Sequence, residues 1–159
     1  MAVRAEVIER LYETHYDGLL RLAYLLGGDS GAEDLVHDAF VRALDHWRPG
    51  APEEAFRAWA QTTMVRLSAS KWRRASRERI AYERHGALGD VAAPEPVPEV
   101  EVALAALTPR QRAATVLRYY EDLPDAAIAE RMGVRVGTVK ALLHQARERL
   151  RIEPVLAAR

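Results

Sequence analysis

The sequence predicts an all-α protein that consists of two small helical domains. Apolar residues recur at helical spacing along most of the 159 residues, and no alternating pattern is long enough to indicate a strand. Glycine, proline and capping residues divide the helical stretches. An acidic, proline-containing segment separates them into two groups. These observations predict domains at residues 1–85 and 101–159, joined by a linker at residues 86–100.

The N-terminal domain is predicted to contain three helices, at about residues 3–26, 31–47 and 53–79. Ser30 and Glu33 are spaced as a capping box at the start of the second helix. Apolar residues at helical spacing are expected to form the buried faces. These residues are Ile8, Leu11, Tyr12, Leu19, Leu22, Ala23, Leu26, Leu35, Val36, Ala39, Phe40, Ala43, Leu44, Trp47, Phe56, Ala60, Met64 and Leu67.

The linker contains alternating prolines and no basic residue, a composition that blocks helix formation and favours an extended chain. After it, Thr108 and Gln111 are spaced as a second capping box, with Pro109 at the first helical position. Four helices are predicted in the C-terminal domain. They cover approximately residues 100–107, 109–120, 123–132 and 136–150.

The last two predicted helices have the pattern of a helix-turn-helix, a motif that binds duplex DNA. Pro124 lies in the first turn of the shorter helix, and Gly133 is placed to end it in a left-handed conformation. Val139, Leu143, Ala146 and Leu150 form the inward stripe of the second helix. The residues expected to face DNA are Arg135, Val136, Gly137, Thr138, Lys140, Ala141, His144 and Gln145. A helical hairpin inside a core is the simpler alternative.

The formal net charge of zero conceals strong segregation of charge along the chain. Residues 1–65 carry 6 basic and 11 acidic side chains, whereas residues 66–84 carry 7 and 2. Residues 85–107 carry no basic and 4 acidic side chains, and residues 108–159 carry 10 and 6. Two basic segments divided by an acidic one are typical of a protein that binds nucleic acid at two places.

The third helix carries one of these basic segments along a single row of residues. The row changes from aromatic and hydroxyl side chains at Trp59 and Thr63 to arginines further on. Arginine binds phosphate, and exposed aromatic rings stack on unpaired bases. A solvated basic helix end is the simpler interpretation of the same row.

Several functional classes lack their sequence signals. The chain has no cysteine for a disulfide, thiolate metal site or catalytic thiol. No apolar run is long enough for a membrane span, and charges interrupt the N-terminus where a secretory signal would be apolar. Neither a Ser-His-acid set nor a glycine-rich nucleotide loop is present. We therefore expect a cytoplasmic protein that is not an enzyme, with no catalytic residue, metal or cofactor.

The order of these parts resembles the extracytoplasmic-function group of bacterial sigma factors, in the sigma-seventy family. The resemblance covers nearly the whole chain. It depends on Ala32-Glu33-Asp34-Leu35-Val36-His37-Asp38-Ala39-Phe40, on Trp72-Arg73-Arg74, on Leu107-Thr108-Pro109-Arg110-Gln111-Arg112, on Ile128-Ala129-Glu130 and on Gly137-Thr138-Val139-Lys140.

The resemblance implies a sigma factor that binds core RNA polymerase, directs it to promoter DNA and helps to open the duplex. The C-terminal domain would read the upstream (minus-thirty-five) element, and an anti-sigma factor is a candidate partner. The implied polymerase contacts are Asp34, Leu35, His37, Asp38 and Arg42. The implied contacts to the downstream (minus-ten) element are Arg66, Ser70, Lys71, Trp72, Arg73, Arg74 and Arg77.

The chain departs from the family pattern at three places. Members usually have Gln where His37 stands, and many have Asn where Arg66 stands. After Lys140 the family usually continues Ser-Arg-Leu-His-Arg, whereas this chain has Ala-Leu-Leu-His-Gln. Because two arginines are missing from the DNA-facing helix, we expect weak binding of the upstream element by the C-terminal domain alone.

Three other classes fit part of the sequence. A helix-turn-helix regulator without polymerase leaves the acidic second helix unexplained. A helical metalloenzyme could use Asp34 and His37, at the spacing of carboxylate-bridged metal sites, with Glu33 adjacent, but no matching pair occurs on another helix. A sigma-like partner-binding protein without promoter activity fits the altered recognition helix.

Overall fold

The computed structural model describes residues 2–27, 31–85 and 99–150, and it describes only the backbone at positions 75, 76 and 78–85. Within these ranges the chain forms helices and no strand, which confirms the predicted all-α class. The N-terminal group consists of α1 (Ala2–Gly27), α2 (Ala32–His46) and α3 (Glu54–His85). The C-terminal group consists of α4 (Glu99–Ala105), α5 (Pro109–Tyr119), α6 (Asp125–Met132) and α7 (Val136–Leu150).

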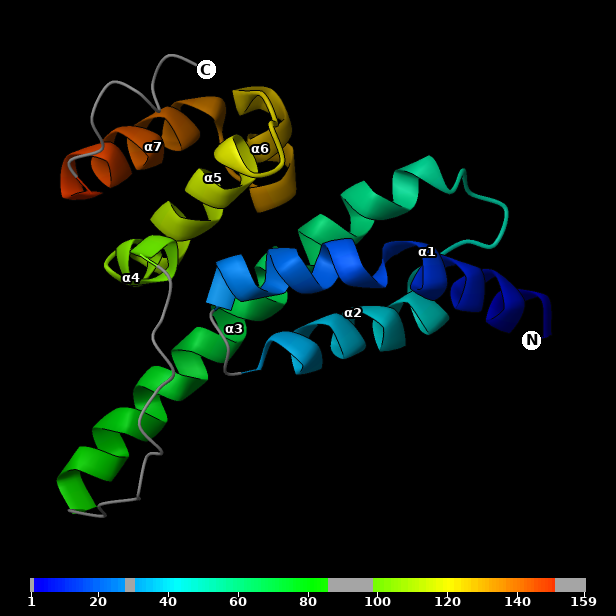
Figure 1. Ribbon diagram of the computed structural model, residues 1–159, viewed down its shortest axis with the longest axis horizontal. Coiled ribbons are helices and arrows are strands. Elements are labelled where there is room, and N and C mark those ends of the chain that lie inside the picture. Colours follow the sequence, from blue (N-terminus) through cyan, green and yellow to red (C-terminus); the bar gives the residue numbers. More distant parts are fainter. Residues whose placement is uncertain (1, 28–30, 86–98, 151–159) are drawn as a thin grey trace.

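The core of the N-terminal group lies where α1 and α2 pack against each other and against α3 (Figure 1). Phe56 is at its centre, with 1% of its surface exposed. Its ring stacks on Trp59, with centroids 5.8 Å apart, and it is nearly perpendicular to the ring of Trp47, with centroids 5.3 Å apart. These aromatic contacts fix the start of α3 against the loop that follows α2.

The far end of α3 projects away from the other helices (Figure 1). Its sequence from residue 71 onward is dominated by charged residues and lacks an apolar stripe of the kind that the first half buries. A helix without such a stripe has little to gain from packing against a core. The projecting part therefore remains available to solvent or to a partner.

Local sequence signals set the boundaries of the C-terminal helices. The predicted capping box at the start of α5 is confirmed. The backbone N–H of Gln111 donates to Thr108 Oγ1 at 3.3 Å, and the backbone N–H of Thr108 donates to Gln111 Oε1 at 3.2 Å. Gly133 ends α6 with a left-handed φ of 67°, as predicted. In α7, Val139, Leu143 and Ala146 are buried. The helix-turn-helix formed by α6 and α7 packs on α5.

Some local predictions are wrong. The residue that caps α2 is Gly31, with a φ of 95° and no side-chain hydrogen bond, so the helix does not begin with the predicted capping box; Ser30 lies outside the described residues. Leu44, expected in the core, is 42% exposed, because the helix turns it past the edge of the buried stripe to which Ala43 and Trp47 belong. Pro124 is the N-cap of α6 and not part of its first turn. Residues 86–98 of the predicted linker also lie outside the described residues, and α4 already begins at Glu99.

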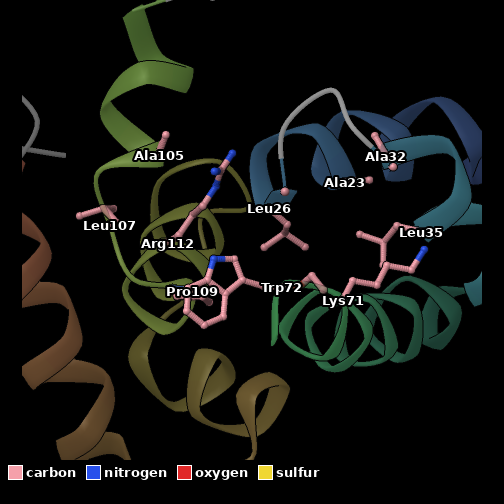
Figure 2. A pocket seen from close by; sticks show the side chains of 13 residues that line it. Ala23, Leu26, Ala32, Leu35, Lys71, Trp72, Ala105, Leu107, Pro109 and Arg112 are labelled. Carbon is pink, nitrogen blue, oxygen red and sulfur yellow. The ribbon is translucent and has the colours of Figure 1, made fainter. Parts of the chain in front are cut away.

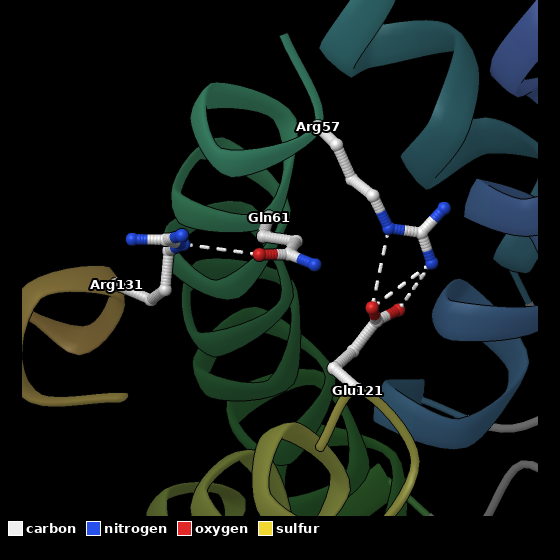
Figure 3. Close-up of polar contacts among 4 residues, drawn as sticks. All are labelled: Arg57, Gln61, Glu121 and Arg131. Carbon is white, nitrogen blue, oxygen red and sulfur yellow. Dashed lines mark hydrogen bonds and ion pairs between the residues drawn. The ribbon is translucent and has the colours of Figure 1, made fainter. Parts of the chain in front are cut away.

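Direct contacts join the two helical groups, mainly through α3 (Figure 3). Arg57 of α3 forms a bidentate ion pair with Glu121, and Arg131 of α6 donates to the buried Gln61 amide oxygen at 3.0 Å. On the other side, Arg112 donates to the carbonyl oxygens of Tyr24 and Leu25 in the last turn of α1.

Burial between the domains lowers the pKa of the Arg112 guanidinium from its ordinary value, and the nearby Glu101 carboxylate opposes this shift. An arginine remains charged at neutral pH even so. Its charge is well placed at this point, because the last carbonyls of α1 have no partner within the helix and the C-terminal end of a helix attracts cations.

Candidate functional site

The projecting part of α3 carries an exposed basic surface. Its members lie between residues 66 and 77 of one helix, so their side chains extend over about three turns. Trp72 lies among them and is 53% exposed. We define the basic surface as Arg66, Ser70, Trp72, Arg73, Arg74 and Arg77, all of which are exposed. Guanidinium groups are suited to bind phosphates, and an exposed indole is suited to stack on a base.

Lys71 differs from its neighbours on α3, because it is half-buried and turned toward α2. Its Nζ lies 3.0 Å from a carboxylate oxygen of Asp38. Sequence reasoning assigned Lys71 to the DNA surface and Asp38 to the polymerase surface. The structure instead joins these two residues, so the two surfaces meet at this ion pair.

A pocket of about 380 Å³ lies between the end of α2 and the middle of α3. It brings together Arg42, predicted as a polymerase contact, with Arg66 and Ser70, predicted as DNA contacts. The remaining lining residues are His46, Trp59, Thr63 and Leu67. Sequence reasoning missed His46, although it lies one helical turn after Arg42 and therefore on the same face.

A second pocket, of about 510 Å³, lies between the two helical groups (Figure 2). Trp72 reaches from α3 toward Pro109 and Arg112 of α5, while Leu26 and Leu35 line the opposite wall. The exposed indole of the basic surface therefore faces the C-terminal domain in this conformation.

The exposed face of α2 carries the predicted polymerase contacts Asp34, His37, Asp38 and Arg42. Leu35 is an exception: it is 3% exposed and belongs to the core, so its side chain is not on this face. Val41 is 59% exposed and, with Leu44, adds an apolar strip that sequence reasoning did not assign to the site. The imidazole of His37 lies about 6 Å from the rings of Tyr12 and Tyr16, which support it from α1.

The recognition helix α7 presents its predicted DNA face to solvent. Thr138 is half-buried, and the other predicted contacts are exposed, namely Arg135, Val136, Gly137, Lys140, Ala141, His144 and Gln145. His144 Nε2 lies 3.2 Å from the carboxylate of Glu148 one turn later. Leu142, which sequence reasoning left out of the inward stripe, is buried.

The described part of the chain lacks both a metal cluster and a membrane-spanning helix. No group of three or more His, Asp or Glu side chains there is arranged to hold a metal ion, so Asp34 and His37 gain no additional ligand. No helix within the same ranges is both long and apolar enough to cross a membrane.

A helix-turn-helix domain beside a helical domain with its own basic surface defines a DNA-binding transcription factor. Comparison with known proteins agrees with this class. Residues 11–78 match the family described as Sigma-70 region 2, and residues 99–150 match Sigma-70, region 4. The basic surface lies within the first match and α7 within the second.

Curated relatives and a solved structure extend this comparison. The chain is 32% identical to the ECF RNA polymerase sigma factor SigE of Mycolicibacterium smegmatis over 90% of its length, although it spans only 60% of that relative. It is 31% identical to the RNA polymerase sigma-E factor of Streptomyces avermitilis, over 91% of the chain and 83% of the relative. The sigma factor RpoE, solved in complex with the anti-sigma factor NepR from Bartonella quintana, superposes with a TM-score of 0.67 at 25% identity, covering 94% of this chain and 96% of that one.

The chain therefore belongs to the extracytoplasmic-function group of RNA polymerase sigma factors. Its function is that of a sigma factor in the initiation of transcription, which is a regulatory role. The resemblance inferred from the sequence motifs is confirmed.

Proposed function

We propose that this sigma factor binds core RNA polymerase through the exposed face of α2. Asp34, His37, Asp38 and Arg42 supply polar contacts, and Val41 and Leu44 supply an apolar strip beside them. The observation that supports this role is an exposed apolar strip next to charged residues on a rigid helix, a composition typical of protein interfaces.

The basic surface of α3 then binds the downstream promoter element and favours its open form. Arginines at successive turns follow the phosphates, and Trp72 stacks on a base only after that base has left the duplex. A surface that prefers single strands shifts the equilibrium toward the open state. This role requires Trp72 to leave the interdomain pocket that it lines in the structure.

The exposed face of α7 binds the upstream element as the second contact of a two-domain reader. Arg135 and Lys140 are its basic residues near the helix start, where side chains reach base edges and phosphates. Each contact alone is weak, and the covalent linkage makes the second contact intramolecular. The chain acts as a non-catalytic factor in the cytoplasm, where its polymerase works, with an anti-sigma factor as a further partner, as for the Bartonella quintana relative.

In-vitro transcription tests this proposal. The purified chain is added to sigma-free core polymerase with genomic fragments, and the transcript starts are sequenced. Discrete starts that share two spaced upstream motifs are the expected result. Stable binding to core polymerase without specific starts would favour a sigma-like partner-binding protein, and neither binding nor starts would overturn the proposal.

A further inference from the structure

A relay of side-chain amides links the start of α5 to the exposed face of α7, the helix that packs against it (Figure 1). Its first link belongs to the capping box, in which the backbone N–H of Thr108 donates to Gln111 Oε1 at 3.2 Å. Its second link runs from Gln111 Nε2 to Gln145 Oε1 at 3.4 Å. The relay therefore joins a helix cap to a residue on the predicted DNA face of α7.

The direction of each hydrogen bond follows from the chemistry of its groups. A backbone N–H can only donate, so the Gln111 atom that faces Thr108 is the amide oxygen. The other end of the same amide is an NH₂ group, which also can only donate. Gln145 must therefore turn its oxygen toward Gln111 and its own NH₂ group away from it.

Gln111 is held too firmly to reverse this direction. The residue is only 9% exposed. Its backbone N–H donates to Thr108 Oγ1 at 3.3 Å, and its carbonyl oxygen accepts from Thr115 Oγ1 at 2.7 Å. A Gln111 amide turned the other way would place its NH₂ group against the Thr108 N–H, so that a buried donor would lose its acceptor. Gln145, in contrast, is exposed, and its free end reaches solvent.

The neighbours of Gln145 on α7 leave room around its free end. Ala141 lies one turn earlier on the same exposed face and carries only a methyl group. The imidazole of His144 lies 3.2 Å from the carboxylate of Glu148, one turn later on the helix. A base edge opposite Ala141 and Gln145 would therefore meet the Gln145 amide as its polar group.

We propose that Gln111 is a positioning residue, which makes Gln145 present a hydrogen-bond donor to the major groove of the upstream element. Guanine offers two adjacent acceptors there, N7 and O6, whereas adenine offers its N7 acceptor beside an N6 donor. A glutamine reads adenine with its oxygen and its NH₂ group together. Because Gln111 engages the oxygen, Gln145 favours guanine over adenine at one position. The inference rests on the proposed function, since α7 must lie on that element.

Promoter binding by the holoenzyme tests this inference. Core polymerase with the chain is titrated against duplexes from the mapped promoters, and each base pair of the upstream element is changed in turn to the other three. At one position we expect guanine to bind about 3- to 10-fold more tightly than adenine. Gln145→Ala should remove this preference at that position alone, which identifies the base pair that Gln145 reads.

Gln111→Glu should reverse the preference. Glutamate at this position of a capping box still accepts from the Thr108 N–H, so the start of α5 is kept. An ionised carboxylate has no donor, and Gln145 should then turn its NH₂ group toward residue 111 and its oxygen toward the base. Adenine and cytosine present amino donors in the major groove, so they should bind more tightly than guanine at the same position.

Gln61→Glu is the matched control, because it makes the same change at another buried glutamine, which accepts from Arg131 outside the relay. It should leave the base preference unchanged. A second measurement needs no substitution at Gln111. Gln145→Ala should speed the exchange of the Gln111 side-chain amide protons with solvent, because it removes their acceptor.

The outcomes separate this inference from the proposed function. If Gln145→Ala removes no guanine preference, or removes a preference for adenine, the assigned direction of the relay is overturned and the sigma role remains. A guanine preference that survives Gln111→Glu overturns the positioning role of Gln111, and so does amide proton exchange that is equal in wild type and Gln145→Ala. Failure of the wild-type holoenzyme to bind any promoter duplex overturns the proposed function and this inference with it.

Discussion

Arg57 of α3 and Glu121, which follows α5, form a bidentate ion pair between the two domains (Figure 3). Arg57 Nη2 lies 2.8 Å from Glu121 Oε1, and Arg57 Nε lies 3.2 Å from Oε2. The glutamate side chain is only 6% exposed, whereas that of the arginine is 41% exposed. A paired, mostly desolvated carboxylate with this geometry fixes how the C-terminal domain meets α3.

Glu121→Gln should loosen the contact between the domains. The substitution keeps the size of the side chain but replaces the bidentate ion pair with a hydrogen bond from the Arg57 guanidinium to an uncharged amide oxygen. Because Arg57 is partly exposed and can regain water, we expect docking to weaken by about 1–2 kcal/mol, a shift of about 5- to 30-fold in the docking equilibrium. Small-angle scattering, or energy transfer between labels on α1 and α7, should report a more extended chain.

The matched control is Arg10→Gln, which breaks the Arg10–Glu53 ion pair inside the N-terminal domain. Both partners are at least half exposed, with side-chain exposures of 62% and 50%. A surface pair contributes less than about 1 kcal/mol, so the interdomain distance should not change. An unchanged distance in Glu121→Gln would show that other contacts, such as Arg131 with Gln61, are enough to hold the domains together.

The helices of this protein were predictable because their signals are local. Amphipathic spacing, Thr108 with Gln111 at a helix start and Gly133 at a helix end all act within a few residues. Contacts between the domains carry no such signal, since Arg57 and Glu121 are 64 residues apart in the sequence. Leu44 shows the same limit: periodicity identifies an apolar stripe, but only packing decides how much of it is covered.

Gly133→Ala should destabilise the helix-turn-helix. Gly133 adopts a φ of 67°, and a Cβ there would meet nothing within 4 Å, so the whole cost is conformational. The left-handed region costs an L-residue about 1–2 kcal/mol, and we expect urea denaturation to show a loss of this size.

Gly27→Ala is the control, because Gly27 ends α1 without a positive φ and also has open space. It should be neutral or stabilise by up to about 1 kcal/mol. Equal effects of the two changes would contradict the prediction.

The stability of the N-terminal domain should fall in mild acid because of His15. Burial lowers the pKa of this imidazole below its ordinary value of 6.5, the Arg57 charge adds to the effect, and Glu53 opposes it. The unfolded chain therefore binds the proton more readily than the folded chain. The contribution of His15 is complete above the unfolded pKa and is lost as the pH falls through 6.5 toward the lower folded value.

Urea denaturation at about pH 7.5 and about pH 5.5 measures this effect. His15→Gln should reduce the difference between the two free energies of unfolding, because glutamine does not titrate. His46→Gln is the control, since His46 is exposed at the end of α2. A pH dependence that is identical in wild type and His15→Gln would assign the acid sensitivity to other groups.

The candidate site was predictable only in part, for a related reason. The row of arginines on α3 follows from spacing on one helix, and so do the exposed residues of α7. The pocket requires the end of α2 to lie beside the middle of α3, and that register is set by the packing of Trp47 on Phe56 and Trp59. Leu35 illustrates the converse, because its motif position suggested a contact while the helix turns it into the core.

Lys140→Ala should weaken promoter binding in a salt-dependent way. Lys140 is exposed on the DNA face of α7, where its exposed neighbours Ala141 and Gln145 carry no charge. With few charges on that face, loss of one should lower the slope of log affinity against log salt by about one unit. Holoenzyme binding to the mapped promoter duplex at several salt concentrations measures the slope.

Arg21→Ala, on α1 and outside both proposed nucleic-acid surfaces, should leave the slope unchanged. An unaltered slope in Lys140→Ala would mean that α7 does not hold DNA in this complex, which would favour the sigma-like partner-binding alternative.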